Sequence, residues 1–183
     1  DIDYGKAAGA GGISYTGKCT ASQKSTLVTA LSNALVYSDG AKNYLTNTTP
    51  SGTPRYSTWF GTYSSSNWNT VKSHYTNISS VYNTQPIVFD CSCKKTNTYA
   101  YVYPSQPYKI YLCGAFWNAP ATGTDSKAGT LVHETSHFTV VAGTQDYAYG
   151  QSAAKSLAIS NPAQAIMNAD SHEYFAENTP AQQ

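Results

Sequence analysis

Charged side chains are scarce in this sequence. Aspartate, glutamate, lysine and arginine make up 11% of its 183 residues, and the formal net charge is +1. An average protein has about a quarter of such residues. Binding of nucleic acid or of an anionic membrane relies on clustered positive charge, so we expect neither as a partner. A surface that is polar but weakly charged, rich in Tyr, Ser, Thr, Asn and Gly, is typical of an extracellular protein.

Long apolar runs are missing as well. No stretch approaches the ~20 apolar residues of a membrane-spanning helix, so we expect no membrane anchor. The first residues, Asp1-Ile2-Asp3-Tyr4, do not read as a signal peptide. We therefore expect the mature form of a secreted protein, from which signal and pro-segments have been removed. Two N-glycosylation motifs, at Asn47 and Asn77, are consistent with secretion.

Cysteine is limited to four residues, Cys19, Cys91, Cys93 and Cys113. The Cys91-x-Cys93 spacing is not that of a zinc knuckle, and a bridge between these near neighbours would be strained. We therefore expect Cys19 to pair with one of them and Cys113 with the other, which leaves two pairings open. Two disulfides indicate an oxidising compartment.

Histidine is equally scarce, yet two of the four histidines stand four residues apart in Leu131-Val132-His133-Glu134-Thr135-Ser136-His137. On a helix this spacing places both imidazoles on one face, where they can bind one zinc ion. Glu134 then lies beside the metal, where it can accept a proton from a water molecule that the metal activates. The alternative is a chance match on an ordinary helix, with histidines satisfied by hydrogen bonds.

A catalytic zinc site needs a third protein ligand and an open position for water. A histidine six residues after His137 is excluded as that ligand, because the position is Gly143. A glutamate from a later helix is a second solution, and Glu173 is the candidate. The turn Gly143-Thr144-Gln145-Asp146 offers Asp146, because its glycine lets the backbone turn back toward the metal.

The combined pattern His133-Glu134-x-x-His137 and Gly143-Thr144-x-Asp146-x-x-Tyr149-Gly150 resembles the aspzincin metallopeptidases, the deuterolysin family. Within that family it looks most like the peptidyl-Lys metalloendopeptidases. The resemblance extends from about residue 19 to the end, and four further segments share it: residues 54–61, 99–104, 112–117 and 167–175.

The resemblance implies roles for the site residues. His133, His137 and Asp146 would bind a single Zn²⁺ ion. Glu134 would act as the general base, and Tyr149 would donate a hydrogen bond to the oxyanion that forms during hydrolysis. The implied activity is that of a secreted zinc endopeptidase acting on proteins and peptides, and we expect it to be a monomer.

Substrate preference is the second implication. Asp170 and Glu173 are three residues apart, so on a helix they share a face and would form an anionic pocket near the metal. The resemblance assigns them to a substrate lysine at P1′, which gives cleavage on the amino side of lysine. The alternatives are a solvated helix face, or Glu173 as the third zinc ligand.

Two other classes of function remain open. A broad-specificity endopeptidase of the deuterolysin type would have the same zinc site, with Asp170 and Glu173 lying away from the cleft. A secreted zinc-binding or carbohydrate-binding module without catalysis would account for the aromatic, Asn/Ser-rich composition. It would not account for Glu134 and Tyr149 at catalytic spacing.

The order of the elements predicts an α+β fold, a single zincin-like metallopeptidase domain that is mainly helical with a small β-sheet. Helices are expected from the capping box at residues 20–23 to about residue 45, from about 66 to 78, over 125–141 around the zinc motif, and over 161–177. Strands are expected at residues 87–91, 98–103 and 109–113, and a loop at 47–54.

One domain is the simplest organisation for 183 residues. The glycine-rich residues 1–18 are expected to form a flexible arm before a metallopeptidase domain at residues 19–183. The family resemblance implies the disulfides Cys19–Cys91 and Cys93–Cys113. Five further side chains are expected to be structural: His74, His172, Trp59, Trp68 and Trp117.

Overall fold

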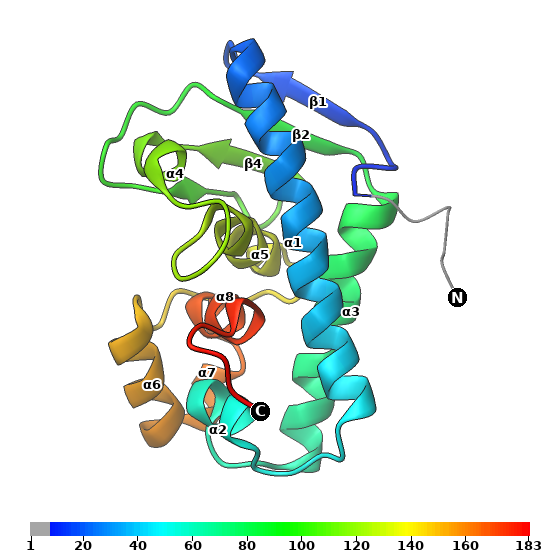
Figure 1. The fold of residues 1–183 in the computed structure, drawn as a ribbon, viewed down its shortest axis with the longest axis vertical. Helices are drawn as coiled ribbons and strands as arrows, with labels where there is room; N and C mark the ends of the chain where they lie inside the picture. The colour runs from blue at the N-terminus through cyan, green and yellow to red at the C-terminus, as the bar shows by residue number, and fades with distance from the viewer. Residues whose placement is uncertain (1–7) are drawn as a thin grey trace.

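The structure, a computed structural model, describes residues 8–183. Two long helices, α1 (Ala21–Asn47) and α3 (Ser65–Thr84), lie side by side along one flank (Figure 1). The shorter helices are α2 (Pro54–Phe60), α4 (Gly114–Asn118), α5 (Lys127–His137), α6 (Gln151–Ser160), α7 (Pro162–Ala165) and α8 (Ala169–Glu177). None of the helices among residues 8–183 has the length and apolar character to cross a membrane.

A small mixed sheet lies at one end of the helical body (Figure 1). Its strands, in the order β1-β2-β4-β3, are β1 (Ile13–Thr16), β2 (Ile87–Asp90), β4 (Lys109–Leu112) and β3 (Ala100–Tyr101). β1 and β4 both pair in parallel with β2, whereas β3 runs antiparallel to β4 and forms an edge of the sheet. The predicted α+β class, mainly helical with a small sheet, is confirmed.

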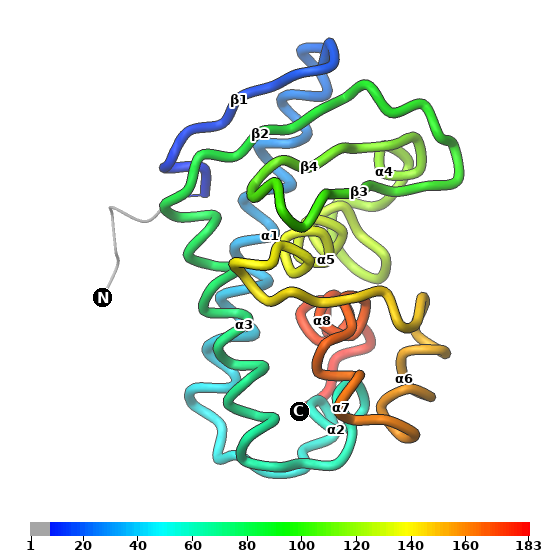
Figure 2. The backbone as a smooth tube through the Cα atoms, turned by 180° about the vertical axis from the view of Figure 1, so that it is seen from behind, coloured from blue at the N-terminus to red at the C-terminus, as the bar shows by residue number. Residues whose placement is uncertain are grey.

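Helix α5 occupies the centre of the molecule, between the sheet and α8 (Figures 1 and 2). It also packs against α1, so its side chains are buried from Ala128 to His137. Large side chains fill the core around it: Tyr56, Phe60, Trp68, Tyr75, Phe89, Phe116, Phe138 and Phe175. The histidine motif therefore stands on a helix that packing holds rigidly from several sides.

The segment expected to be a flexible arm is, from residue 8 onward, part of the fold. Ile13–Thr16 forms β1 in register with β2, and the Gly9 N–H donates to the carbonyl of Tyr82 at 2.8 Å. The expected arm is therefore wrong for residues 8–18, and residues 1–7 lie outside the described part of the chain. Four strand residues between glycines give too short a pattern for recognition, and tertiary contacts stabilise them: the pairing with β2 and the packing of Ile13 and Tyr15 against the core.

The helix expected over residues 161–177 is divided into α7 and α8. Between them, the Gln145 N–H donates to the carbonyl of Met167, and the Ala169 N–H donates to the carbonyl of Gln145, at 2.8 and 2.9 Å. These long-range bonds replace helical ones, so the break at residues 166–168 ties the loop after α5 to the start of α8.

Other element boundaries also differ from expectation. Helix α5 ends at His137, earlier than the expected residue 141, because the next residues form a turn that closes on the carbonyl of Phe138. Helix α2 was not expected, although Thr53 caps it and Pro54 takes its first position. Helix α6 was not expected either. The capping box of α1, Thr20 with Gln23, is confirmed.

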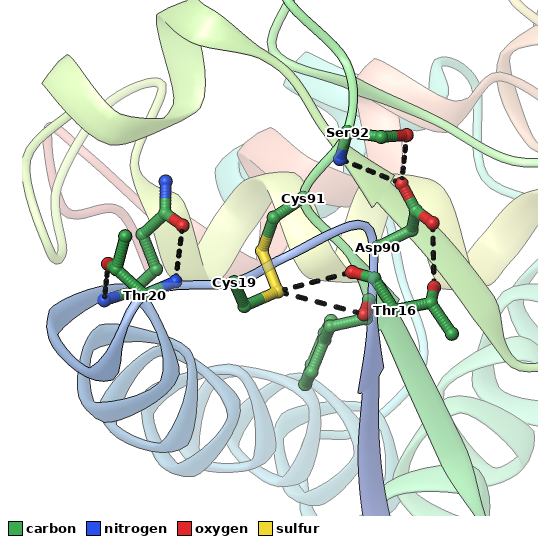
Figure 3. Close-up of a disulfide and its surroundings, with 8 residues drawn as sticks. Thr16, Cys19, Thr20, Asp90, Cys91 and Ser92 are labelled. Atoms are coloured by element: carbon green, nitrogen blue, oxygen red, sulfur yellow. Dashed lines mark hydrogen bonds between the residues drawn. A yellow bond between two sulfur atoms is a disulfide. The ribbon is translucent and has the colours of Figure 1, made fainter.

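The two disulfides join Cys19 to Cys91 and Cys93 to Cys113, which is the pairing that the family resemblance implied. The first ties the start of α1 to the end of β2, next to the side chain of Asp90 (Figure 3). Partial burial alone would raise the pKa of Asp90, but hydrogen bonds from Ser92 and Thr16 hold it below its usual value. The second disulfide closes the segment that carries β3 and β4.

Candidate active site

The three side chains expected to bind zinc converge on one point. Nε2 of His133 and Nε2 of His137 lie 3.2 Å apart, and each lies 3.1 Å from Oδ1 of Asp146. In a tetrahedral zinc site with bonds of about 2.1 Å, neighbouring ligand atoms are about 3.4 Å apart. The triangle formed by these three atoms therefore has nearly the size that one zinc ion requires.

The tautomers of both histidines also fit a metal ion. Nδ1–H of His137 donates to the carbonyl of Thr144 at 2.9 Å, and Nδ1–H of His133 donates to Oδ1 of Asp170 at 2.6 Å. In the neutral imidazoles each Nε2 consequently carries a lone pair, and the two lone pairs face each other beside the Asp146 carboxylate. Such atoms repel one another unless a cation lies between them. Hydrogen bonds from Nδ1 are also the usual orienting partners of histidines that bind metals.

The turn after α5 returns Asp146 to the histidines. Gly143 adopts a left-handed φ of 61°, as a sharp reversal requires. The Thr144 N–H then donates to the carbonyl of Ser136 at 3.1 Å, and their hydroxyls lie 2.6 Å apart. Farther along, Asn168 accepts hydrogen bonds from the N–H groups of Tyr147 and Ala148. Asn168 was not expected as a site residue, because only the fold brings it to this turn.

Glu134 lies next to the three candidate ligand atoms without joining them. Its Oε2 is 3.7 Å from Nε2 of His133, and the residue is 5% exposed. Burial raises the pKa of Glu134, although the two imidazoles partly offset this effect. A carboxylate with raised proton affinity, beside the metal, is suited to accept a proton from an attacking water molecule.

Tyr149 stands at the rim, with 66% of the residue exposed. Partial burial and the neighbouring Asp146 carboxylate raise the pKa of Tyr149 to about 12. The phenol therefore keeps its proton at neutral pH and remains a hydrogen-bond donor.

A cleft of about 680 Å³ opens over these residues. One wall consists of α5 and α8, and the other consists of residues 97–102, which include the edge strand β3. Tyr149 and Gly150, just before α6, also line the cleft. The cleft is therefore lined by all three candidate ligand residues, His133, His137 and Asp146.

Asp170 and Glu173 both line the cleft from α8. Both oxygens of Asp170 are engaged: Oδ1 accepts from His133, and Oδ2 accepts from the Gly150 N–H at 2.7 Å. Oε2 of Glu173 is buried and has no N–H or hydroxyl donor among residues 8–183, although the carboxyl group lies within hydrogen-bonding reach of the Glu177 carboxyl. Burial and the adjacent carboxylate of Glu177 raise the pKa of Glu173 well above its usual value.

Glu173 lies on the Nδ1 side of the His133 ring, away from the nitrogen that belongs to the ligand triangle. Its Oε1 lies 3.7 Å from Nδ1 of His133, the nitrogen that donates to Asp170, whereas the triangle uses Nε2. The geometry therefore favours Asp146 over Glu173 as the third ligand.

Helix α8 also supports the start of α5. The N–H groups of Asp125 and Ser126 donate to the carboxylate of Glu177 at 3.2 and 2.9 Å, and the Ser126 hydroxyl donates to it at 2.9 Å. This contact requires Gly129, since a Cβ there would lie 1.9 Å from Oε2 of Glu177. Glu177 was also missed in the sequence, where it looks like an ordinary acid near a helix end.

The fold and the ligand geometry together define the class of this protein, a metallopeptidase of the zincin type. Residues 44–177 match the model of the aspzincin family, described as lysine-specific metallo-endopeptidase, and the chain belongs to that family. The family expected from the sequence is therefore confirmed.

Known proteins extend the likeness over most of the chain. The chain is 58% identical over 170 residues to the peptidyl-Lys metalloendopeptidase of Armillaria mellea and 50% identical over 170 residues to an extracellular protease of Aeromonas hydrophila. Each alignment covers 93% of this chain but 48% and 49% of the relatives, so the chain spans about half their length. A solved zinc peptidase from Grifola frondosa has a TM-score of 0.87 and 56% identity, covering 90% of this chain and 100% of that one.

Proposed function

We propose that this chain is a secreted zinc endopeptidase that hydrolyses peptide bonds on the amino side of lysine. The observation that carries the hydrolytic part is the triangle of His133, His137 and Asp146 with Glu134 beside it. The preference for lysine is supported by the buried, unpartnered Oε2 of Glu173 in the same cleft. It is also supported by the name of the relative from Armillaria mellea, peptidyl-Lys metalloendopeptidase.

A single zinc ion bound by His133, His137 and Asp146 would polarise the attacking water and the substrate carbonyl. Glu134 takes the proton of that water and passes it to the amine that leaves, a role for which its raised pKa is suited. Tyr149 donates a hydrogen bond to the oxyanion that develops on the substrate carbonyl, and this donor stabilises the transition state more than the ground state.

The substrate backbone has a natural partner in β3. This strand is at the edge of the sheet and lines the cleft, so a peptide in extended conformation can add to it as a further strand. The side chain after the cleaved bond then points toward α8. There the ammonium group of a lysine would be a cationic partner for the carboxylates of Glu173 and Asp170.

A broad-specificity endopeptidase is the second candidate, and the engagement of Asp170 favours it. Both oxygens of Asp170 already accept hydrogen bonds within the protein, which leaves Glu173 as the carboxylate that is free to bind a cation. The zinc site and the role of Glu134 would be the same in this case.

A digest of a denatured protein mixture tests the proposal, with cleavage sites mapped by mass spectrometry in the presence and absence of a chelator. Chelator-sensitive cleavage with new peptides that begin with lysine would support both parts. Chelator-sensitive cleavage before many residue types would leave the metallopeptidase and contradict the lysine preference. No cleavage by folded, zinc-loaded protein would contradict both and favour a binding module.

We also propose that the protein acts outside the cell as a monomer. The two disulfides suit an oxidising compartment, and one relative is an extracellular protease. Sedimentation of the zinc-loaded protein together with its activity at nanomolar concentration would test the monomer. Activity that is lost on dilution as a dimer dissociates would contradict it.

A further inference from the structure

A lysine ammonium carries three N–H donors, and a site that binds it in a buried position must offer acceptors for them. The two carboxylates assigned to this role offer few. Asp170 already accepts from His133 and Gly150, and Glu173 has one oxygen, Oε2, that is buried without a donor among residues 8–183. Such an oxygen, in a residue that is only 4% exposed, marks a place where a ligand donor belongs.

Asp125 lines the same cleft, immediately before α5. Its position is fixed by α8 through two hydrogen bonds: the Tyr174 hydroxyl donates to Oδ1 at 2.6 Å, and the Asp125 N–H donates to Glu177 at 3.2 Å. The backbone is in the left-handed region with a φ of 52°, as a sharp turn between Thr124 and the α5 cap requires. No group from residues 8 to 183 donates to its other oxygen, Oδ2.

Apart from His133, which contacts Asp170 and Glu173, no basic side chain of the described residues pairs with the acidic wall. Within the described chain, no lysine or arginine forms an ion pair with Asp125, Asp170 or Glu173. Lys127, the lysine nearest to Asp125 in the sequence, donates a hydrogen bond from its ammonium group to the carbonyl of Ala119 instead. Asp125 in particular has no cationic partner among residues 8–183, so a ligand ammonium can pair with it.

Tyr99 lies on the opposite wall of the cleft, and the carboxylates of Asp125 and Glu173 affect its pKa. Partial burial raises the pKa of Tyr99, and the charges of Asp125 and Glu173 raise it further. Tyr99, Asp125 and Glu173 all line the same cleft.

We propose that Asp125 is a third carboxylate of the lysine pocket and a specificity-determining residue for lysine at P1′. This inference rests on the proposed function. In it, Oε2 of Glu173 and Oδ2 of Asp125 accept the N–H groups of the ammonium, while Tyr174 and Glu177 hold Asp125 in place. Asp170 contributes mainly charge, because its oxygens are occupied.

The test uses the zinc-loaded protein and two fluorogenic peptides that differ only at P1′, one with lysine and one with neutral norleucine. For Asp125→Asn we expect kcat/KM for the lysine peptide to fall about tenfold or more, chiefly through KM. The norleucine peptide should stay within about twofold of the wild type, since it makes no charged contact. Asparagine can still accept from Tyr174 and tolerates the left-handed backbone, so the fold is retained.

Two further variants complete the experiment. Tyr174→Phe removes the hydroxyl that orients Asp125, so it should also lower the preference for lysine over norleucine, by less than Asp125→Asn does. If Asp125→Asn does not fold, Tyr174→Phe provides the test of the role of Asp125. Asp39→Asn, on α1 and outside the cleft, is the matched control and should change neither peptide.

The outcomes separate this inference from the proposed function. A wild type that does not prefer lysine over norleucine would overturn both. A wild type that prefers lysine, with an unchanged preference in Asp125→Asn, would overturn only the role of Asp125. An equal loss for both peptides would also overturn it, because it would show a structural effect.

Discussion

Nδ1–H of His133 donates a 2.6 Å hydrogen bond to Oδ1 of Asp170, which joins α5, the helix of the histidine motif, to α8. The same carboxylate holds the Gly150 N–H with its second oxygen. One side chain thus orients a proposed metal ligand, anchors the rim of the cleft beside Tyr149 and adds a carboxylate to the cleft.

Replacing Asp170 by asparagine should weaken zinc binding about 10- to 100-fold, because His133 loses the charged partner that orients its ring and raises its basicity. Competition with a chromophoric chelator measures this affinity directly. Asp39→Asn, which removes an acid from α1 outside the cleft, serves as the control. Unchanged zinc affinity in Asp170→Asn would show that the hydrogen bond does not support the metal.

Glu134→Gln should retain zinc and lose hydrolysis by about 10²–10⁴-fold or more, since the amide cannot accept the proton of the attacking water. Metal content by atomic absorption and kcat on a lysine peptide together check this prediction. Substantial remaining activity, in a preparation shown to contain no wild-type enzyme, would contradict the assignment of Glu134 as the general base.

Tyr149→Phe should lower kcat about 100-fold with little change in KM, because the hydrogen bond to the oxyanion is made mainly in the transition state. The neighbouring Tyr147, 46% exposed, provides the matched control Tyr147→Phe. With a pKa of about 12, Tyr149 should add no loss of activity between pH 7 and pH 10. A fall that appears in KM instead would indicate a role in substrate binding.

Two glycine substitutions should have opposite effects on stability. A Cβ at Gly129 would lie 1.9 Å from Oε2 of Glu177, so Gly129→Ala should lower the free energy of unfolding by roughly 1–3 kcal/mol. Gly40 in α1 has nothing within 4 Å, and Gly40→Ala should raise it by about 0.5–1 kcal/mol through helix propensity. Urea denaturation measures both, and equal signs would contradict the close approach of α5 and α8.

Acid should destabilise the protein through two buried histidines. Burial lowers the pKa of His74 to about 4, and burial together with His74 lowers the pKa of His172 to about 3. Both titrate near 6.5 in an unfolded chain, so that chain binds more protons than the native protein below about pH 6.5. The free energy of unfolding should therefore be highest above about pH 6.5 and fall as the pH drops toward about 3, by on the order of a few kcal/mol.

His172→Asn tests this origin of acid sensitivity. Urea denaturation of wild type and variant at pH 7 and pH 4, at one fixed zinc concentration, separates the histidine effect from acid release of the metal. The variant should show the smaller difference between the two pH values. An identical difference would assign the acid sensitivity to other groups.

Local patterns in the sequence were sufficient for much of the fold and for the centre of the site. The capping box of Thr20 and Gln23, the four-residue spacing of His133 and His137, and the turn before Asp146 each encode their geometry within a few residues. The ligand triangle forms because these local geometries are compatible with each other.

What the sequence could not give depends on contacts between distant segments. Strand β1 exists because β2 lies beside it, and the break before α8 exists because Gln145 bonds there. Asn168, Glu177 and Asp125 look like ordinary polar residues in the sequence. The fold brings Asn168 to the turn after Asp146, Glu177 to the start of α5 and Asp125 to the cleft. Their roles follow from tertiary contacts that no short pattern contains.

The position of α8 in the chain has a consequence for truncated forms. The three candidate ligands are all present by Asp146, but the carboxylate that orients His133 and one wall of the cleft come with α8, more than twenty residues later. A fragment that ends before α8 would keep the histidine motif without this support. The segment after Asp146 is therefore as much a part of the site as the motif itself.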